Sequence, residues 1–285
     1  MQTITHSFRI VPRRLDLEVG IIYTHERQWM HRLLASIAGS ADGLDTGMIL
    51  VDNASANGLE PWEDYFTNTL VLQNPERLGY AANLNRILAA STARYVLLIN
   101  TDLFFDPQER CLTQMVEFMD RHPECGIAGC RVYHEDGSSA YSARRFQTLR
   151  VLLSRRFGLG RWMPRTLEQY FYGDRPVNGQ WECDWVSGCF MLMRRKAVEE
   201  VGLFDTGFVK YFEDVDMCLR MARAGWTPMY NGQTYCYHVE RRASKNLISL
   251  DAWKHARSYL RWLTKWGLAP AATLPPVAAK LRRAA

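Results

Sequence analysis

The sequence lacks several features that would place it in a familiar class. It has no run of about 18 apolar residues, the length that a membrane-spanning helix needs. Residues 1–6 lack the apolar segment of a secretory signal peptide. No glycine-rich loop has P-loop or dinucleotide-binding spacing, which argues against a P-loop kinase or a nicotinamide enzyme. We therefore expect a chain that neither spans a membrane nor is exported.

Cysteine is present, but not in a pattern that binds zinc or performs redox chemistry. The seven cysteines are odd in number, scattered, and include no C-x-x-C pair. We interpret them as free thiols, which are typical of the reducing cytoplasm. A cytoplasmic location is therefore expected.

Positive charge is concentrated in two segments. The net charge is only +5, but basic residues crowd residues 144–165 and 254–283. Such clusters favour an anionic partner, either a phosphate or a membrane surface. In the second cluster, residues 250–266 predict a basic amphipathic helix that carries tryptophans. This helix could rest on an anionic membrane, or it could pack its apolar stripe on the rest of the protein.

Short apolar strands alternate with helical segments in the first part of the chain. We expect strands at 17–23, 48–51, 70–73, 95–99 and 126–132, and helices at 29–37, 80–90 and 108–121. This order predicts an α/β fold with a Rossmann-like, mostly parallel sheet flanked by helices. A ligand of such a sheet lies outside the carboxyl ends of the strands.

The second part of the chain is less regular. Residues 135–182 lack a clear pattern and predict a lid or substrate-facing insertion. Further elements are expected as strands at 185–193 and 234–238 and as helices at 195–201 and 215–224. We divide the chain into one α/β domain, residues 1–245, and a helical C-terminal extension, residues 246–285.

Four polar clusters fall where the sheet would bring them together. They are Thr24 to Arg27, Asp52 to Ser55, Asn100 to Asp102, and Glu213 to Asp216 with His238. Taken singly, several have a structural alternative: an Asx-turn for Asp52 to Ser55, a helix cap or turn for Asn100 to Asp102, and a satisfied core or loop histidine for His238. Asp102 follows the most apolar strand, where a carboxylate suits a hard cation held together with a diphosphate.

Three of these carboxylates occupy four positions in an apolar setting, the segment from Tyr211 to Arg220. Burial there costs desolvation energy, so the segment is a candidate for proton transfer or cation binding. Burial and a like charge should raise the pKa of Asp214, which suits a general base near neutral pH. Glu213 and Asp216 could instead only cap the helix that follows.

Ordered motifs along the chain resemble those of the family 2 glycosyltransferases, most closely the bacterial rhamnosyltransferase-like branch. The resemblance covers about residues 17–266 and rests on segments 49–55, 74 with 78–85, 97–102, 184–195, 201–205, 211–226, and His238 with Ser244. It implies a GT-A fold and a hexosyltransferase that inverts the anomeric carbon of a nucleotide diphosphate sugar.

The resemblance also implies residue roles. Asp214 matches the general base, with Glu213 and Asp216 as supporting residues. Asp102 and His238 match ligands of a divalent metal, Mg²⁺ or Mn²⁺. The residues that would line the nucleotide pocket are Thr24, Glu26, Asp52, Arg77, Asn85 and Asn100. Asp184 and Trp185 match the acceptor-side wall, within an insertion at 135–182 that would face the acceptor or act as a lid.

Two positions depart from the family pattern. Asn100 stands where the metal motif usually has an acid, which leaves Asp102 as its only carboxylate. The first strand runs into Thr24-His25-Glu26 rather than the usual Tyr-Asn, which weakens the roles assigned to Thr24 and Glu26.

The implied partners are a dTDP- or UDP-sugar donor and a glycan or lipid-linked glycan acceptor of bacterial surface polysaccharide synthesis. Rhamnose is the leading sugar, and galactofuranose stays open. Peripheral contact with the inner face of the plasma membrane and a homo-oligomer are further expectations, whereas a nucleic-acid partner is not expected. The alternatives are an inactive sugar-nucleotide-binding or scaffold protein and a nucleotidyltransferase. The latter normally has a glycine- and lysine-rich loop after the first strand, and this sequence has none.

Overall fold

A computed structural model describes residues 14–59, 62, 65–156, 162–239 and 250–267. Ser244, the basic residues beyond 267 and the remainder of the predicted extension lie outside these residues. Within them, no helix combines the length and the apolar character needed to cross a bilayer.

The core of the protein is a nine-stranded mixed sheet with the order β3-β2-β1-β4-β10-β6-β11-β5, in which β8 also pairs with β11. Its strands are β1 (Leu17–Tyr23), β2 (Thr46–Asp52), β3 (Thr69–Gln73), β4 (Tyr95–Ile99), β5 (Leu103–Phe104), β6 (Cys125–Tyr133), β8 (Gln180–Glu182), β10 (Phe190–Arg194) and β11 (Thr227–His238). The first four are mutually parallel, β10 is antiparallel to both β4 and β6, and β6 is parallel to β11. The predicted mostly parallel sheet is thereby confirmed.

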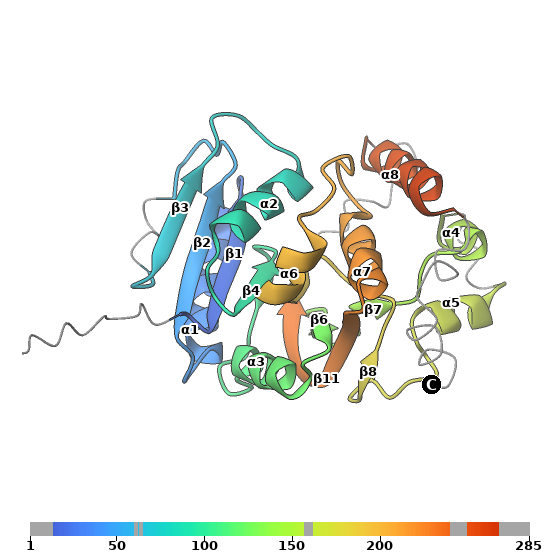
Figure 1. Cartoon of the computed structure of the whole chain (residues 1–285), viewed down its shortest axis with the longest axis horizontal. Helices are drawn as coiled ribbons and strands as arrows, with labels where there is room; N and C mark the ends of the chain where they lie inside the picture. Colours follow the sequence, from blue (N-terminus) through green and yellow to red (C-terminus); the bar gives the residue numbers. More distant parts are fainter. Residues whose placement is uncertain (1–13, 60–61, 63–64, 157–161, 240–249, 268–285) are drawn as a thin grey trace, which may run out of the picture.

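Helices cover both faces of this sheet (Figure 1). They are α1 (Arg27–Ser40), α2 (Tyr80–Ala90), α3 (Cys111–Arg121), α4 (Leu149–Arg156), α5 (Pro164–Tyr170), α6 (Arg195–Val201), α7 (Glu213–Arg223) and α8 (Leu250–Trp266). A second, two-stranded sheet pairs β7 (Ala143–Arg144) with β9 (Trp185–Val186).

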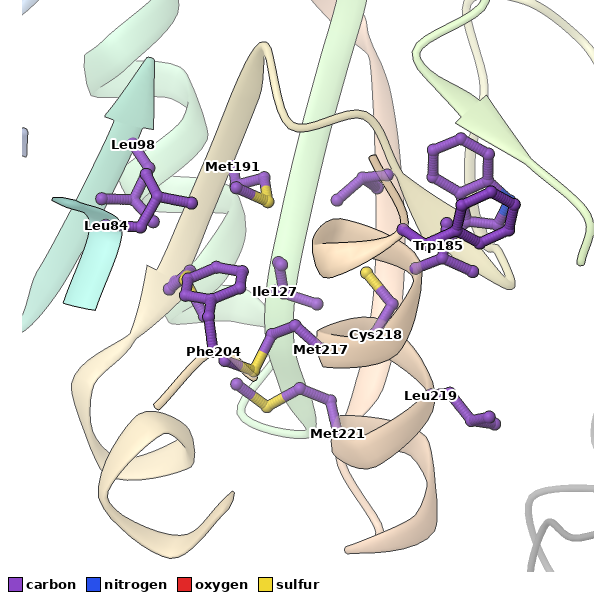
Figure 2. Close-up of a cluster of buried hydrophobic side chains, with 14 of the residues drawn as sticks. Leu84, Leu98, Ile127, Trp185, Met191, Phe204, Met217, Cys218, Leu219 and Met221 are labelled. Atoms are coloured by element: carbon purple, nitrogen blue, oxygen red, sulfur yellow. The ribbon is translucent and has the colours of Figure 1, made fainter. Parts of the chain in front are cut away.

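Strand alternation explains why both faces are covered. Side chains of a strand point alternately to opposite faces, and Val96 and Leu98 of β4 join one buried cluster while Leu97 and Ile99 join the other. The first cluster receives apolar residues of α2, α6, α7 and α8, and the second receives those of α1 and α3. Figure 2 shows the first cluster, where Met217 of α7 faces the sheet.

Several expectations about the second half of the chain were wrong in detail. The apolar run at 185–193 is not one strand, because it breaks between β9 and β10 at residues 187–189. The last strand begins at Thr227, not at Thr234, since it continues through a register shift along β6. The insertion at 135–182 contains α4, α5, β7 and β8, so it is more ordered than its sequence pattern indicates.

Helix α8 packs on the α/β domain at the end remote from β3 (Figure 1). Trp262 is fully buried and lies 5.9 Å from Phe212 between ring centroids. Trp253 and Leu260 are exposed on the same helix. Both behaviours considered for this helix therefore have a structural basis, because one face packs on the domain while aromatic and apolar groups remain accessible on another.

Candidate active site

The carboxyl ends of β1, β2 and β4 bring the first three polar clusters together. Tyr23 pairs with Asp52 across the β1–β2 ladder, and the Asn53 N–H donates to the Tyr23 carbonyl at 2.8 Å. Thr24 and Asp52 therefore begin adjacent loops at one sheet edge. This is the edge at which a ligand of an open α/β sheet binds.

The side chains predicted for nucleotide binding are partly used within these loops. Glu26 accepts hydrogen bonds from the Thr24 and His25 N–H groups, both at 2.9 Å. Asp52 accepts one from the Ser55 N–H at 2.8 Å, so it forms the turn that was its structural alternative. A carboxylate that accepts one such bond retains further acceptor positions, so neither contact removes these residues from a ligand site.

A buried asparagine network that the sequence reasoning missed holds the next loop. Asn53 Oδ1 accepts from the Asn74 side chain at 2.9 Å and from the Leu78 N–H at 2.8 Å. Asn74 also donates to the side chain of Asn83 on α2. The segment that carries Arg77, whose side chain is exposed, is thereby fixed at the carboxyl end of β2. Three asparagines in apolar contexts were the only sequence signal for this network.

Asn85 performs a structural task in this structure. Its side-chain amide donates to the Phe204 carbonyl at 2.9 Å and accepts from the Phe204 N–H at 2.8 Å. These two bonds join α2 to the segment that precedes α7. Its role in the nucleotide pocket stays a prediction, and its observed contacts are with the backbone.

Asp102 and His238 meet, as predicted, although 136 positions separate them in the chain. The antiparallel β5–β11 ladder pairs His238 with Leu103, and the Val239 N–H donates to the Asp102 carbonyl at 2.9 Å. Asp102 Oδ1 and His238 Nε2 lie 3.1 Å apart. Both side chains are mostly buried, with exposed fractions of 20% and 12%.

This pair fits a cation that a substrate helps to hold. Within the described parts of the chain no third His, Cys, Asp or Glu joins the pair to make a closed metal site. Mg²⁺ commonly uses one or two carboxylates and takes its other ligands from water and substrate phosphates. The donor set therefore suits a metal bound together with a diphosphate and not a stand-alone structural metal.

Asp214 lies at the start of α7 in a geometry that its neighbours impose. Its Oδ2 accepts from the Gly188 N–H and its Oδ1 from the Val215 N–H, both at 2.9 Å. Tyr211 and Phe212, immediately before this helix, both have positive φ angles, 72° and 70°. Non-glycine residues in this region cost backbone energy and are concentrated at functional sites.

Burial raises the pKa of Asp214, and the two backbone N–H groups oppose this rise because they favour the charged form. Glu213 is buried beside it, and burial together with the Asp214 charge raises the Glu213 pKa to about 8. Its Oε2 has no hydrogen-bond partner among the described residues. Both carboxyls therefore have pKa values above their ordinary range, which is the direction that suits a general base working near neutral pH.

Tyr80 connects the carboxylate pair with the Asn100 loop and was not singled out as a site residue. Its hydroxyl lies 3.1 Å from both Asn100 Oδ1 and the Gly188 carbonyl, so it donates to one of them at a time. Burial, then the charges of Glu213 and Asp214, raise its pKa well above the ordinary value. Tyr80 stays protonated, and it marks the middle of the site.

The predicted acceptor-side residues mainly orient a neighbouring arginine. Asp184 accepts from the Phe146 N–H and Trp185 donates to the Arg145 carbonyl, both at 2.8 Å. These bonds fix the strand β7, whose Arg144 guanidinium lies 4.9 Å from the Trp185 ring centroid. The positive charge of Arg144 lowers the pKa of Asp214, against the effect of burial. Arg144 is a site residue that the sequence showed only as one of a cluster of arginines.

Asp216 points away from the base and binds α8. Its carboxylate is fully buried, and it accepts from Arg220 at 2.9 Å and from Trp266 and Lys265 at 2.8 Å. Its contacts hold α7 against α8, and its expected support of Asp214 stays a prediction. This outcome differs from the helix cap that was its structural alternative.

The structure thus combines an α/β fold with the Asp102–His238 pair in one loop region and the Asp214–Glu213 carboxyl pair at the start of α7. The chain belongs to glycosyl transferase family 2, whose family model matches residues 18–202, well over half of the sequence. It is a glycosyltransferase, as the resemblance implied. The matched region ends before α7, so Asp214 and α8 lie outside it.

Two curated proteins are similar in sequence. An N-acetylglucosaminyl-diphospho-decaprenol L-rhamnosyltransferase of Mycobacterium tuberculosis is 28% identical over 81% of this chain and 78% of its own length. The rhamnosyltransferase WbbL of Escherichia coli K12 is 26% identical over 60% of this chain and 62% of its own length.

A solved structure agrees with the predicted GT-A fold. The mannosyltransferase PcManGT of Pyrobaculum calidifontis, in complex with GDP-Man and Mn²⁺, superposes with a TM-score of 0.57 over 96% of this chain and 80% of its own. The two sequences are only 18% identical, so this likeness concerns the fold.

Proposed function

We propose that the protein transfers a sugar, with rhamnose as the leading donor sugar, from a nucleotide diphosphate to an acceptor hydroxyl with inversion at the anomeric carbon. The observation that carries the proposal is the geometry of Asp214, a carboxylate with a raised pKa held by the Gly188 and Val215 N–H groups. The names of these curated relatives support rhamnose as the transferred sugar, and the dTDP nucleotide is part of the proposal. UDP-galactofuranose is an alternative donor, and a comparison of donor binding distinguishes the two.

The chemistry needs one base and a way to accommodate the leaving diphosphate. The acceptor hydroxyl gives its proton to Asp214 as its oxygen bonds to the anomeric carbon on the face opposite the diphosphate. The bond from that carbon to the diphosphate oxygen breaks, and its electron pair leaves with the nucleotide diphosphate. Asp214 later releases the proton to solvent, which is possible because its side chain is only partly buried.

Asp102 and His238 would hold a divalent metal, Mg²⁺ or Mn²⁺, which supplies positive charge for the leaving diphosphate when it is bound. The Mn²⁺ named with the structural neighbour supports this assignment. Thr24, Glu26, Asp52, Arg77 and Asn100 would line the nucleotide pocket. Their common position at the carboxyl ends of neighbouring strands supports it.

The acceptor we propose is a glycan or a lipid-linked glycan of bacterial surface polysaccharide synthesis. The mycobacterial relative is named for a lipid diphosphate acceptor. Exposed Trp253 and Leu260 on α8, with the Arg257 guanidinium 5.8 Å from the Trp253 ring, form a surface that suits an anionic membrane face. We propose that the enzyme works peripherally at the inner face of the plasma membrane.

Donor binding with and without metal tests the proposal. Each nucleotide sugar, dTDP-rhamnose, UDP-galactofuranose, UDP-N-acetylglucosamine and GDP-mannose, is added with and without Mn²⁺ or Mg²⁺, and the unfolding temperature is measured. A ligand at 100 times its Kd stabilises the folded state by about 2.7 kcal/mol. We expect the largest shift with dTDP-rhamnose and metal.

Asp102→Ala and His238→Ala should each remove most of the metal-dependent part of that shift. Asp42→Ala is the matched control, because Asp42 is an exposed carboxylate paired with Arg110. If both variants give the same metal titration curve as the wild type, Asp102 and His238 are not ligands of the metal. No shift with any nucleotide sugar would leave the scaffold alternative in place.

A further inference from the structure

A second hollow lies beside the active site, within the insertion. It is a cavity of about 240 Å³ between the loop at 139–143, the segment at 171–177 and β11. Its lining includes five aromatic rings, those of Tyr141, Phe171, Tyr172, Trp181 and Tyr230. None of these residues takes part in the donor or base chemistry described above.

The rings form an aromatic wall made of two contacting groups. Between centroids, Tyr141 lies 4.5 Å from Phe171, Tyr172 lies 4.8 Å from Trp181, and Trp181 lies 4.4 Å from Tyr230. Polar groups also line the cavity. The Tyr172 hydroxyl accepts from the Asp184 N–H at 3.0 Å, which leaves its own proton to donate, and the Arg175 side chain lines the same hollow.

The cavity adjoins the base through Arg144. The guanidinium of Arg144 lies 6.0 Å from the ring centroid of Phe171, which is a cavity wall, and its charge acts on Asp214. Ser142 and Ala143, the two residues before it, line the cavity directly. The Ser142 carbonyl also accepts from the Ser187 N–H at 2.7 Å, and the next residue, Gly188, donates its N–H to Asp214, so the cavity lining connects to the segment that holds the base.

Size and chemistry select the occupant. Pockets for drug-sized ligands measure roughly 300–1,000 Å³, so a cavity of about 240 Å³ is too small for a nucleotide sugar and suits one sugar ring. A pyranose ring presents C–H bonds on its face and hydroxyls at its edge. An aromatic wall with a few polar groups matches both.

We propose that this cavity is an acceptor subsite, which holds a sugar ring of the acceptor glycan next to the residue that receives the transferred sugar. The proposal rests on the proposed function, because it requires a glycan acceptor. The ring stacks on the Tyr141 and Phe171 side of the wall, and the Tyr172 hydroxyl and Arg175 bind its hydroxyl groups. The subsite thereby selects acceptors and positions the reacting hydroxyl near Asp214.

Two variants test the subsite without removing the base. Tyr141→Asn deletes an exposed ring and keeps a residue that tolerates the observed φ of 49°. Val177→Trp fills the mouth of the cavity from a side chain that is 52% exposed. The matched controls are Tyr65→Asn and Leu70→Trp, at exposed positions that do not line the cavity.

The first measurement is saturation-transfer NMR with methyl glycosides of N-acetylglucosamine, glucose, galactose and rhamnose, with dTDP and the diamagnetic Mg²⁺ added to fill the donor site. We expect at least one glycoside to receive saturation from the wild type and from the controls, and this signal to be lost in both cavity variants. Equal signals from all five proteins, or no signal from any glycoside, would overturn the subsite.

The second measurement is steady-state transfer to a short-chain N-acetylglucosaminyl-diphospho-lipid, compared with a lipid-linked disaccharide. We expect both cavity variants to raise the disaccharide KM at least fivefold, with the donor KM unchanged and the monosaccharide acceptor less affected. Unchanged acceptor KM values in variants that still transfer sugar would overturn the subsite and leave the proposed function intact. Failure of the wild type to bind any donor would instead overturn the proposed function.

Discussion

At the scale of single residues, the site separates two tasks between two groups of side chains. Asp102 and His238 form the pair suited to a cation, and Asp214 and Glu213 form a coupled pair whose pKa values burial has raised. Tyr80 lies between them and contacts the Asn100 loop and the Gly188 backbone. The separation is physical, because a cation would lower the pKa of any carboxylate that bound it.

The first residue-scale prediction concerns the base. Asp214→Asn keeps the side-chain shape but cannot accept the proton, so kcat should fall by about 10²–10⁴-fold, the usual contribution of a general base. The donor-dependent thermal shift should remain within a few-fold of wild type in apparent affinity. Normal turnover in this variant would contradict the assignment of the base.

The second residue-scale prediction concerns the pH dependence of kcat/KM. Burial and then the charge of Asp214 raise the pKa of Glu213 from 4.5 to about 8. A base acts only when ionised, so kcat/KM should rise with pH as the pair loses its protons. Glu213→Gln removes the group with the pKa of about 8, so the pH profile of kcat/KM should lose its inflection near pH 8. The exposed Glu199→Gln is the matched control.

The same substitution has a predicted effect on stability. Because the folded state keeps a proton on Glu213 that the unfolded chain releases above pH 4.5, stability should fall as the pH rises from about 4.5 to about 8. Glu213→Gln should flatten this dependence in urea titrations. Profiles of rate and stability that superimpose on those of the wild type would contradict the raised pKa.

At the scale of elements, α8 stabilises the segment that presents the base. Asp205 pairs with Arg261 at 2.8 Å, and the Ser258 hydroxyl donates to the Lys210 carbonyl at 2.8 Å. Phe212, whose backbone has a positive φ, lies 5.6 Å from Tyr259 between ring centroids. These contacts bracket Tyr211 and Phe212, and they help to maintain a backbone conformation that is costly in isolation.

Asp216→Asn tests this element. It leaves Arg220 and Lys265 without their buried carboxylate, and breaking such a pair costs roughly 3–5 kcal/mol when it is fully buried. Since Arg220 and Lys265 are 18% and 28% exposed, we expect a loss near the lower limit. Urea unfolding at constant m-value measures the loss, and kcat should fall with it.

Trp266→Phe is a milder change at the same contact between Asp216 and α8, and its effect on stability is compared with that of Asp216→Asn. It removes the hydrogen bond to Asp216, which is worth about 1.5–3 kcal/mol to a charged group, and it reduces the indole to a single ring, so part of the packing is lost as well. If Asp216→Asn proves no more destabilising than Trp266→Phe, the ion pairs do not hold α8 on α7.

At the scale of the whole molecule, the two ends of the sheet have different tasks. The end near β3 carries the loops proposed for the nucleotide, and the opposite end carries the insertion and α8 (Figure 1). Under the proposed function, acceptor recognition and surface contact would therefore be separated from donor binding. This arrangement lets the exposed face of α8 contact a membrane while the nucleotide loops remain accessible.

Vesicle binding tests this arrangement. Trp253 and Leu260 are 63% and 62% exposed, and the protein should co-sediment with phosphatidylglycerol vesicles more than with phosphatidylcholine vesicles, and less at high salt. Trp253→Ala combined with Leu260→Ser should weaken the binding. Leu70→Ser, on β3 at the opposite end, is the control and should not. Equal binding to both lipids, or none, would contradict a membrane-facing α8.

Much of the fold was predictable because its signals are local. The bounds of α2, β4, α6 and α8 were predicted to the residue, since apolar spacing at the helical or strand period marks them. The break at residues 187–189 was not predicted, although Ser187 and Gly188 interrupt the apolar run there. Its cause is tertiary: the Gly188 N–H leaves the strand to bind Asp214.

The sequence by itself determined the order of strands and helices, the four polar clusters at strand ends and the acidic start of α7, because each depends on neighbours in the chain. Only the tertiary structure decided what each side chain contacts. Asn85 binds Phe204 across 119 positions, Asp216 binds Trp266 across 50, and Arg144 comes to face Asp214. The partners of a buried polar group are whichever donors and acceptors packing places within reach, and sequence distance does not limit that choice.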